Sequence, residues 1–222
     1  MARGTGKRIG VVLAGCGYLD GSEIHEATLT LLELDREGAT VRAAAPDVDQ
    51  MHVVDHRQGK PTSERRGVLA EASRITRGKI EPLTALKAAD LDALIFPGGF
   101  GAAKNLCTFA VDGAQFKVNP EVERIVREMH AAKKPMGFIC IAPVIAAKVL
   151  GEQHLRLTIG DDKETAAVLE GLGAKHLDCK VDEIAVDEVN KIVSTPAYML
   201  GPTIAPVAAG IARLVAKVLD LA

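Results

Sequence analysis

The sequence predicts an α/β fold in which a mainly parallel sheet carries helices on both faces. Short runs that are apolar at nearly every position, such as residues 9–14, 91–96 and 136–139, are typical of strands covered on both sides. Stretches with helical spacing of apolar residues lie between these runs, and glycines follow several of them, as expected where strand, turn and helix alternate. At 222 residues the chain suits one domain, residues 1–222.

The expected elements follow along the chain from local signals. Apolar positions spaced as in a helix begin after Ser22 and end before Gly38, Asn119 and Pro120 favour a helix start, and Pro143 favours another. The predicted strands are 8–14, 40–45, 91–96, 136–139, 156–159, 175–181 and 191–195. The predicted helices are 22–37, 67–75, 120–132, 143–150, 165–172 and 203–219.

A polar insertion at about 49–82 is longer than the usual connection in such a fold, and long connections tend to be lids, binding loops or interface segments. The formal charge of −2, with Lys and Arg interspersed among Asp and Glu, argues against nucleic acid as a partner. No segment is apolar over the length of a membrane span, and the N-terminal residues 1–14 are too short for a signal peptide. We therefore expect no membrane association and a cytoplasmic location.

The four cysteines are far apart and form no Cys-x-x-Cys pair, so neither a metal site nor a disulfide framework is indicated. Cys140 stands out, because it lies between the buried strand 136–139 and the helix that begins at Pro143. A turn of this kind lifts a side chain above the sheet edge, and the helix N-terminus favours a thiolate. Cys140 is therefore the candidate nucleophile, although a free cysteine is also often a small buried apolar residue.

Three turns that are distant in the sequence would meet around Cys140, since the carboxyl ends of parallel strands lie at one edge of the sheet. The backbone N–H groups of Gly98, Gly99 and Ile141 could form an oxyanion hole there. Glu23, in the first turn of the first helix, is the carboxyl group expected to share a proton with Cys140. Its spacing from Asp20 also fits a capping box.

Two further sites were weighed from the residues. The glycines of 15–21 resemble a dinucleotide fingerprint only superficially, because Asp20 would repel a pyrophosphate, so no cofactor is expected. No histidine adjoins Cys140 in the sequence. A Cys–His dyad with His52 or His56 from the insertion stays open, against solvated loop histidines.

Four ordered blocks closely resemble the ElbB group of the ThiJ/PfpI superfamily, and the similarity covers nearly the whole chain. The blocks are GCGYLDGSEIHEA at 15–27, FPGGFGAAKNL at 96–106, ICIAP at 139–143 and STPAYM at 194–199. The resemblance implies a flavodoxin-like sandwich, similar to the class I glutamine amidotransferase domain, and a homodimer. It also implies a Glu on the first helix hydrogen-bonded to Cys140, a weak cofactor-free glyoxalase activity on methylglyoxal or glyoxal, and a link to isoprenoid biosynthesis.

One departure separates this chain from relatives that cleave amides. Those relatives carry a His directly after the Cys or later in the chain, whereas here position 141 is Ile. Amide cleavage needs a base that also protonates the leaving amine, so the expected reaction is conversion of a small 2-oxoaldehyde to a 2-hydroxy acid by Cys140 and Glu23. The alternative is a redox-sensing or regulatory binding protein in which Cys140 is oxidised.

Overall fold

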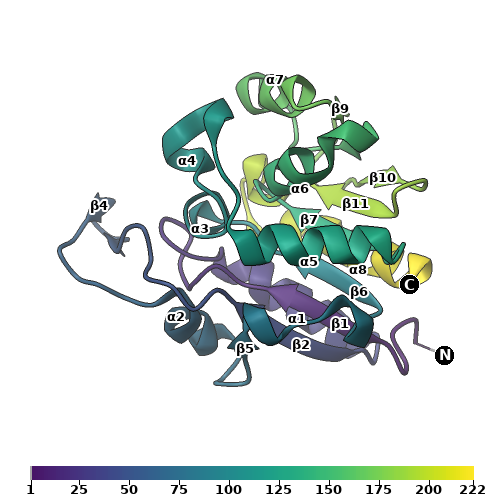
Figure 1. Cartoon of the computed structure of the whole chain (residues 1–222), viewed down its shortest axis with the longest axis horizontal. Helices are drawn as coiled ribbons and strands as arrows, with labels where there is room; N and C mark the ends of the chain where they lie inside the picture. The colour runs from purple at the N-terminus through teal and green to yellow at the C-terminus, as the bar shows by residue number, and fades with distance from the viewer. Residues whose placement is uncertain (1) are drawn as a thin grey trace.

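A seven-stranded sheet forms the centre of the chain in the computed structural model, which describes residues 2–222 (Figure 1). All neighbouring strands pair in parallel except the first pair, β10 and β11, which is antiparallel. The mainly parallel sheet predicted from the apolar runs is confirmed. In spatial order the strands are β10 (Ala185–Asp187), β11 (Ile192–Thr195), β7 (Met136–Ile139), β6 (Ala93–Phe96), β1 (Arg8–Val12), β2 (Thr40–Ala45) and β5 (Glu81–Pro82).

Helices cover both faces of this sheet, which explains why its central strands are apolar at successive positions. Side chains alternate between the faces, so Leu94 and Phe96 of β6 pack into one core and Ile95 into the other. One core lies under α5 (Pro120–Ala131) and α6 (Pro143–Leu150), and α5 lies in front of the sheet in Figure 1. The other core lies under α1 (Ile24–Arg36), α2 (Val68–Ile75) and α8 (Ile204–Leu221).

Short elements complete the described part of the chain. The short helices are α3 (Phe100–Lys104), α4 (Phe109–Asp112) and α7 (Lys163–Gly171), with 3-10 turns η1 (Leu83–Ala85), η2 (Ala88–Asp90), η3 (Gly113–Gln115), η4 (Gly151–Gln153) and η5 (Ala197–Met199). Two small sheets pair β3 (Val54–Asp55) with β4 (Lys60–Pro61), and β8 (Arg156–Leu157) with β9 (Lys175–His176).

Most predicted elements are present with bounds close to those expected. The strands at 40–45 and 136–139 and the helix at 143–150 have the predicted bounds. The strands expected at 156–159 and 175–181 are shorter and pair with each other outside the main sheet. The strand beside β11 is β10, which the sequence did not indicate. The prediction for the N-terminal residues includes Met1, which lies outside the described residues.

The polar insertion projects from the molecule at the end opposite the two chain termini (Figure 1). Its β3–β4 hairpin and α2 lie between β2 and β5, and α2 begins one residue later than predicted. Because β1, β6 and β7 are parallel, the loops that follow them reach the same edge of the sheet. That edge carries the candidate site.

Candidate active site

The predicted bend between strand and helix is present at Cys140. Its φ angle is 61°, in the left-handed region that a residue with a side chain seldom adopts. The Cys140 N–H donates to the Thr195 carbonyl at 2.9 Å, and the Ala142 N–H donates to that of Ile139 at 3.0 Å. The chain therefore turns sharply from β7 into α6 and holds the Cys140 side chain at the sheet edge, 7% exposed.

The carboxyl group that contacts the Cys140 sulfur is Glu26, not Glu23 as predicted. Glu26 is fully buried and is a hydrogen-bond partner of the Cys140 thiol. Its Oε2 accepts the Gly98 N–H at 2.9 Å, and its Oε1 accepts the Tyr198 N–H at 3.3 Å. Both oxygens are thus held by backbone donors, which fixes the carboxyl group beside the sulfur.

Helix geometry explains why Glu26 takes this place. The buried face of α1 is made by Glu26, Ala27, Thr30 and Leu34, which follow helical spacing. Glu23 lies one turn earlier, at the N-cap, where its side chain accepts the Glu26 N–H at 2.7 Å. The signal that was missed is this spacing, because it places Glu26 on the same face as Leu34.

Burial raises the pKa of both partners in this pair. It raises the pKa of Glu26 to about 8, and the nearby charge of Glu23 raises it further in the same direction. Burial first and the charge of Glu26 second raise the pKa of the Cys140 thiol well above its usual value. The pair is therefore doubly protonated at neutral pH and loses its first proton as one unit.

The turn after β6 supplies backbone donors to the same place. The N–H groups of Gly99 and Ile141 hydrogen-bond to the Cys140 sulfur and act against the rise in its pKa. Gly98 departs from the prediction, because its N–H is donated to Glu26. A Cβ on Gly98 would lie 2.5 Å from the Cys140 Cβ and 2.7 Å from the Glu26 Oε2, so only glycine fits between them.

The loop after β1 holds this turn through backbone hydrogen bonds. The Phe100 N–H donates to the Tyr18 carbonyl at 2.7 Å, the Gly101 N–H to that of Gly21 at 2.8 Å, and the Glu23 N–H to that of Gly98 at 3.0 Å. A Cβ on Gly99, whose φ is 93°, would lie 2.3 Å from the Glu23 nitrogen. The two loops are thus in direct backbone contact.

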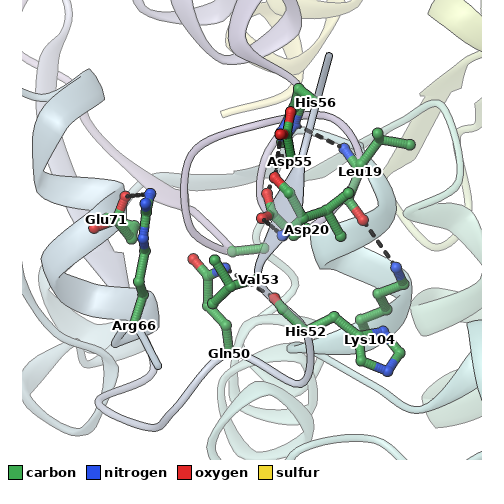
Figure 2. Close-up of polar contacts among 12 residues, drawn as sticks. Leu19, Asp20, Gln50, His52, Val53, Asp55, His56, Arg66, Glu71 and Lys104 are labelled. Atoms are coloured by element: carbon green, nitrogen blue, oxygen red, sulfur yellow. Dashed lines mark hydrogen bonds and ion pairs between the residues drawn. The ribbon is translucent and has the colours of Figure 1, made fainter. Parts of the chain in front are cut away.

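The insertion in turn braces the loop after β1, as Figure 2 shows. The Oδ2 of Asp20 accepts the Val54 N–H at 2.7 Å, and the His56 Nε2 accepts the Leu19 N–H at 3.3 Å. Lys104 donates to the Leu19 carbonyl at 2.9 Å from the other side. His56 therefore supports the loop backbone, and neither His52 nor His56 lines the cavity over Cys140.

A cavity of about 420 Å³ opens above Cys140 and is lined by side chains from six regions of the chain. Within residues 2–222, no histidine, lysine or arginine lines it. The lining residues are Tyr18, Glu23, Gly99, Phe100, Ala103, Phe109, Ala110, Cys140, Ile141, Asp162, Thr165, Tyr198 and Met199. The structure thus brings the predicted Cys140, Glu23, Gly99 and Ile141 to one cavity, with Gly98 and Glu26 behind its floor.

The neighbouring polar groups lie at the rim of this cavity. The His25 Nδ1 lies 2.7 Å from the Tyr198 hydroxyl and 4.0 Å from the Glu23 Oε1, and its side chain is half exposed. In the described part of the chain, no group of three or more His, Cys, Asp or Glu side chains is arranged to hold a metal ion. The site is built from a thiol, carboxyl groups and backbone amides.

Comparison with known proteins was made at the level of family models, curated sequences and solved structures. No family model matches the chain. The rat "ES1 protein homolog, mitochondrial" is 53% identical over 96% of this chain and 84% of its own length. The human "glutamine amidotransferase-like class 1 domain-containing protein 3, mitochondrial" is 52% identical over 96% of this chain and 83% of its own.

The chain belongs to the ES1 family. Among solved structures, an isoprenoid biosynthesis protein with an amidotransferase-like domain from Ehrlichia chaffeensis matches 96% of this ES1-family chain and 99% of its own chain. Its TM-score is 0.89 and its identity 36%. This places the family in the ElbB group of the ThiJ/PfpI superfamily, as the four sequence blocks predicted.

More distant solved structures share the fold of this ES1-family chain. A ThiJ/PfpI domain protein from Brachyspira murdochii matches 98% of both chains with a TM-score of 0.58 and 14% identity. The predicted class I glutamine amidotransferase-like fold is therefore confirmed.

The location expected from the sequence does not agree with the names of the relatives. Both mammalian ES1-family relatives are named mitochondrial, whereas the sequence suggested the cytoplasm. Within residues 2–222, none of the helices combines the length and apolar character needed to cross a bilayer. The missing targeting segment on which the cytoplasmic prediction depended is a weak basis for naming a compartment.

Proposed function

We propose that the chain is a cofactor-independent glyoxalase, which converts small 2-oxoaldehydes such as methylglyoxal and glyoxal to 2-hydroxy acids. The observation that carries the proposal is the Cys140–Glu26 pair at the floor of a cavity whose described lining holds carboxyl groups and no histidine. Amide cleavage needs a group that protonates a departing amine. A 2-oxoaldehyde needs only a nucleophile and a proton moved between neighbouring carbons, which carboxyl groups can supply.

The first step is addition of the Cys140 sulfur to the aldehyde carbon. The pair reacts in its singly ionised form, with the remaining proton held by Glu26 and the charge on the sulfur. A carbon–sulfur bond forms, and the carbonyl oxygen takes the negative charge. The N–H groups of Gly99 and Ile141, which hydrogen-bond to the sulfur, are the donors closest to that oxygen.

The later steps move one proton and add one water. The former aldehyde carbon loses its proton to a carboxyl group, and the neighbouring carbon receives a proton, which leaves a thioester of the hydroxy acid on Cys140. Glu23 suits this role, because it lines the cavity while Glu26 is bound behind the floor. Water then hydrolyses the thioester, releasing the acid and restoring the thiol, so the substrate is oxidised at one carbon and reduced at the next.

Lactate formation from methylglyoxal by the purified protein tests the proposal. Cys140→Ala is expected to lower kcat/KM at least about a hundredfold, and Glu26→Gln and Glu23→Gln about tenfold or more. Cys179→Ala is the matched control, because Cys179 is also half-buried and does not line the cavity. Full activity in Cys140→Ala would eliminate the proposed mechanism.

The name of the Ehrlichia chaffeensis relative suggests isoprenoid biosynthesis as a setting for this activity. Removing the gene and measuring methylglyoxal and isoprenoid levels together would test that part of the proposal. An unchanged isoprenoid level with raised methylglyoxal would separate the activity from the pathway.

A further inference from the structure

The charges around the cavity suggest which 2-oxoaldehydes it accepts. Two acidic side chains, Glu23 and Asp162, line it from different elements, at the start of α1 and at the start of α7. The charge of Glu23 is already felt within the site, since it raises the pKa of Glu26 and of Tyr198. An anionic substrate would therefore enter a cavity that already carries negative charge.

The nearest cationic groups do not offset this charge inside the cavity. The Lys104 ammonium donates to the Leu19 carbonyl and lies 5.4 Å from the centre of the Phe100 ring, so it is bound at the rim. His25, half exposed, hydrogen-bonds to Tyr198 outside the lining. A carboxylate or phosphate on a substrate would thus find no cationic side chain among the described lining residues.

The remaining wall is apolar and large. Phe100, Phe109, Ile141 and Met199 face the cavity together with Ala103 and Ala110. Its volume of about 420 Å³ lies within the range of about 300–1,000 Å³ typical of pockets for drug-sized ligands. A three-carbon aldehyde would leave most of this apolar wall uncovered.

We infer that the cavity selects uncharged 2-oxoaldehydes with an apolar arm larger than a methyl group, and disfavours anionic ones. Glu23 and Asp162 set the charge preference, and Phe100 and Phe109 bind the arm. This inference rests on the proposed function for the identity of the reacting group. The charge preference itself applies to any reagent that reaches the Cys140 sulfur.

The charge preference is tested without turnover by alkylation of Cys140. The rates for iodoacetamide and iodoacetate are followed by mass spectrometry of the Cys140 peptide, and their ratio is compared with that of 2-mercaptoethanol. We expect the ratio at Cys140 to exceed the free-thiol ratio by about fivefold to tenfold, because two nearby charges act in a partly buried site. A ratio equal to that of the free thiol would overturn the inference.

Isosteric variants assign the effect to the two carboxyl groups. Glu23→Gln and Asp162→Asn keep an oxygen that can accept the Glu26 and Thr165 N–H groups, so α1 and α7 keep their caps. Each is expected to bring the ratio toward the free-thiol value by about twofold to threefold. Glu33→Gln, near the other end of α1 and paired with Arg36, is the control and should leave the ratio unchanged. Equal ratios in all three variants would contradict the assignment.

Turnover tests the preference for the arm. Phenylglyoxal should give a higher kcat/KM than methylglyoxal, 4-carboxyphenylglyoxal should be about tenfold poorer than phenylglyoxal, and Phe109→Ala should lower the phenylglyoxal value more than the methylglyoxal value. Equal values for the charged and uncharged aryl compounds would overturn the inference. Selective alkylation with no turnover of any 2-oxoaldehyde would overturn the proposed function and support the charge preference.

Discussion

Cys140 and Glu26 are best understood as one titrating unit. The thiol and the carboxyl group hydrogen-bond to each other in a buried place, and each charge opposes the formation of the other. The first proton leaves with an apparent pKa of about 8, which belongs to the pair. A reactive sulfur therefore depends on a single negative charge shared by both residues.

Glu26→Gln is expected to lower the pKa of Cys140, because it removes the charge that raises it. In the native protein, the rate of iodoacetamide reaction at Cys140 should rise with pH from about 8 upward. The variant should reach half its maximal rate at a lower pH. The measurement is the pH profile of alkylation, and a profile moved to higher pH in the variant would contradict the assignment.

At the scale of elements, the loop after β1 and the turn after β6 form one backbone assembly under the cavity. Gly101 shows how closely they approach. A Cβ at Gly101 would lie 2.4 Å from the main chain of Gly21, and main-chain atoms cannot move aside as a side chain can. The position of Gly99 and its N–H therefore depends on this contact.

Gly101→Ala should lower the free energy of unfolding by about 2 to 3 kcal/mol, because it overpacks two backbones. It should also reduce the alkylation rate of Cys140, since the turn at Gly99 must shift. Gly171→Ala is the matched control: it is also in a helix, and its Cβ would meet nothing within 4 Å. That control should be neutral or stabilising by up to about 1 kcal/mol in urea denaturation. Equal stability of both variants would refute the close-contact argument.

Local signals were sufficient for some elements and not for others. The bend at Cys140 was predictable, because an apolar strand and a helix-starting proline fix its place. The choice between Glu23 and Glu26 was not, because a buried acid on an amphipathic helix is recognised only when the apolar face is traced through Ala27 and Leu34. The strand β10 was not predicted either, since three residues pairing with β11 leave no periodic pattern.

At the scale of the whole molecule, the sheet order brings β1, β6 and β7 side by side. The chain thereby collects three loops that are more than forty residues apart in sequence around one cavity. The buried acid that results has a cost in stability that depends on pH.

The free energy of unfolding should fall as the pH rises toward 8. Folded Glu26 holds its proton up to about pH 8, whereas the unfolded carboxyl group loses its proton near pH 4.5. The folded state therefore binds more protons between these values. The stabilisation is complete below the unfolded pKa and is lost as pH rises through the folded one.

Glu26→Gln lacks this titration, so its stability relative to the native protein should improve by about 3 to 5 kcal/mol between about pH 5 and about pH 9. Urea denaturation of both proteins across this range measures the difference. Parallel stability curves would show that Glu26 does not carry its raised pKa in the folded state.

The groups that hold the Cys140 sulfur and the Glu26 carboxyl group are largely peptide N–H groups, of Gly98, Gly99, Ile141 and Tyr198. Side-chain replacement does not delete a peptide group, whereas the cavity walls are made of side chains. Evolution and protein engineering can therefore alter what enters the cavity while leaving the reacting floor in place, and homologues with different substrates are expected to differ first at the walls.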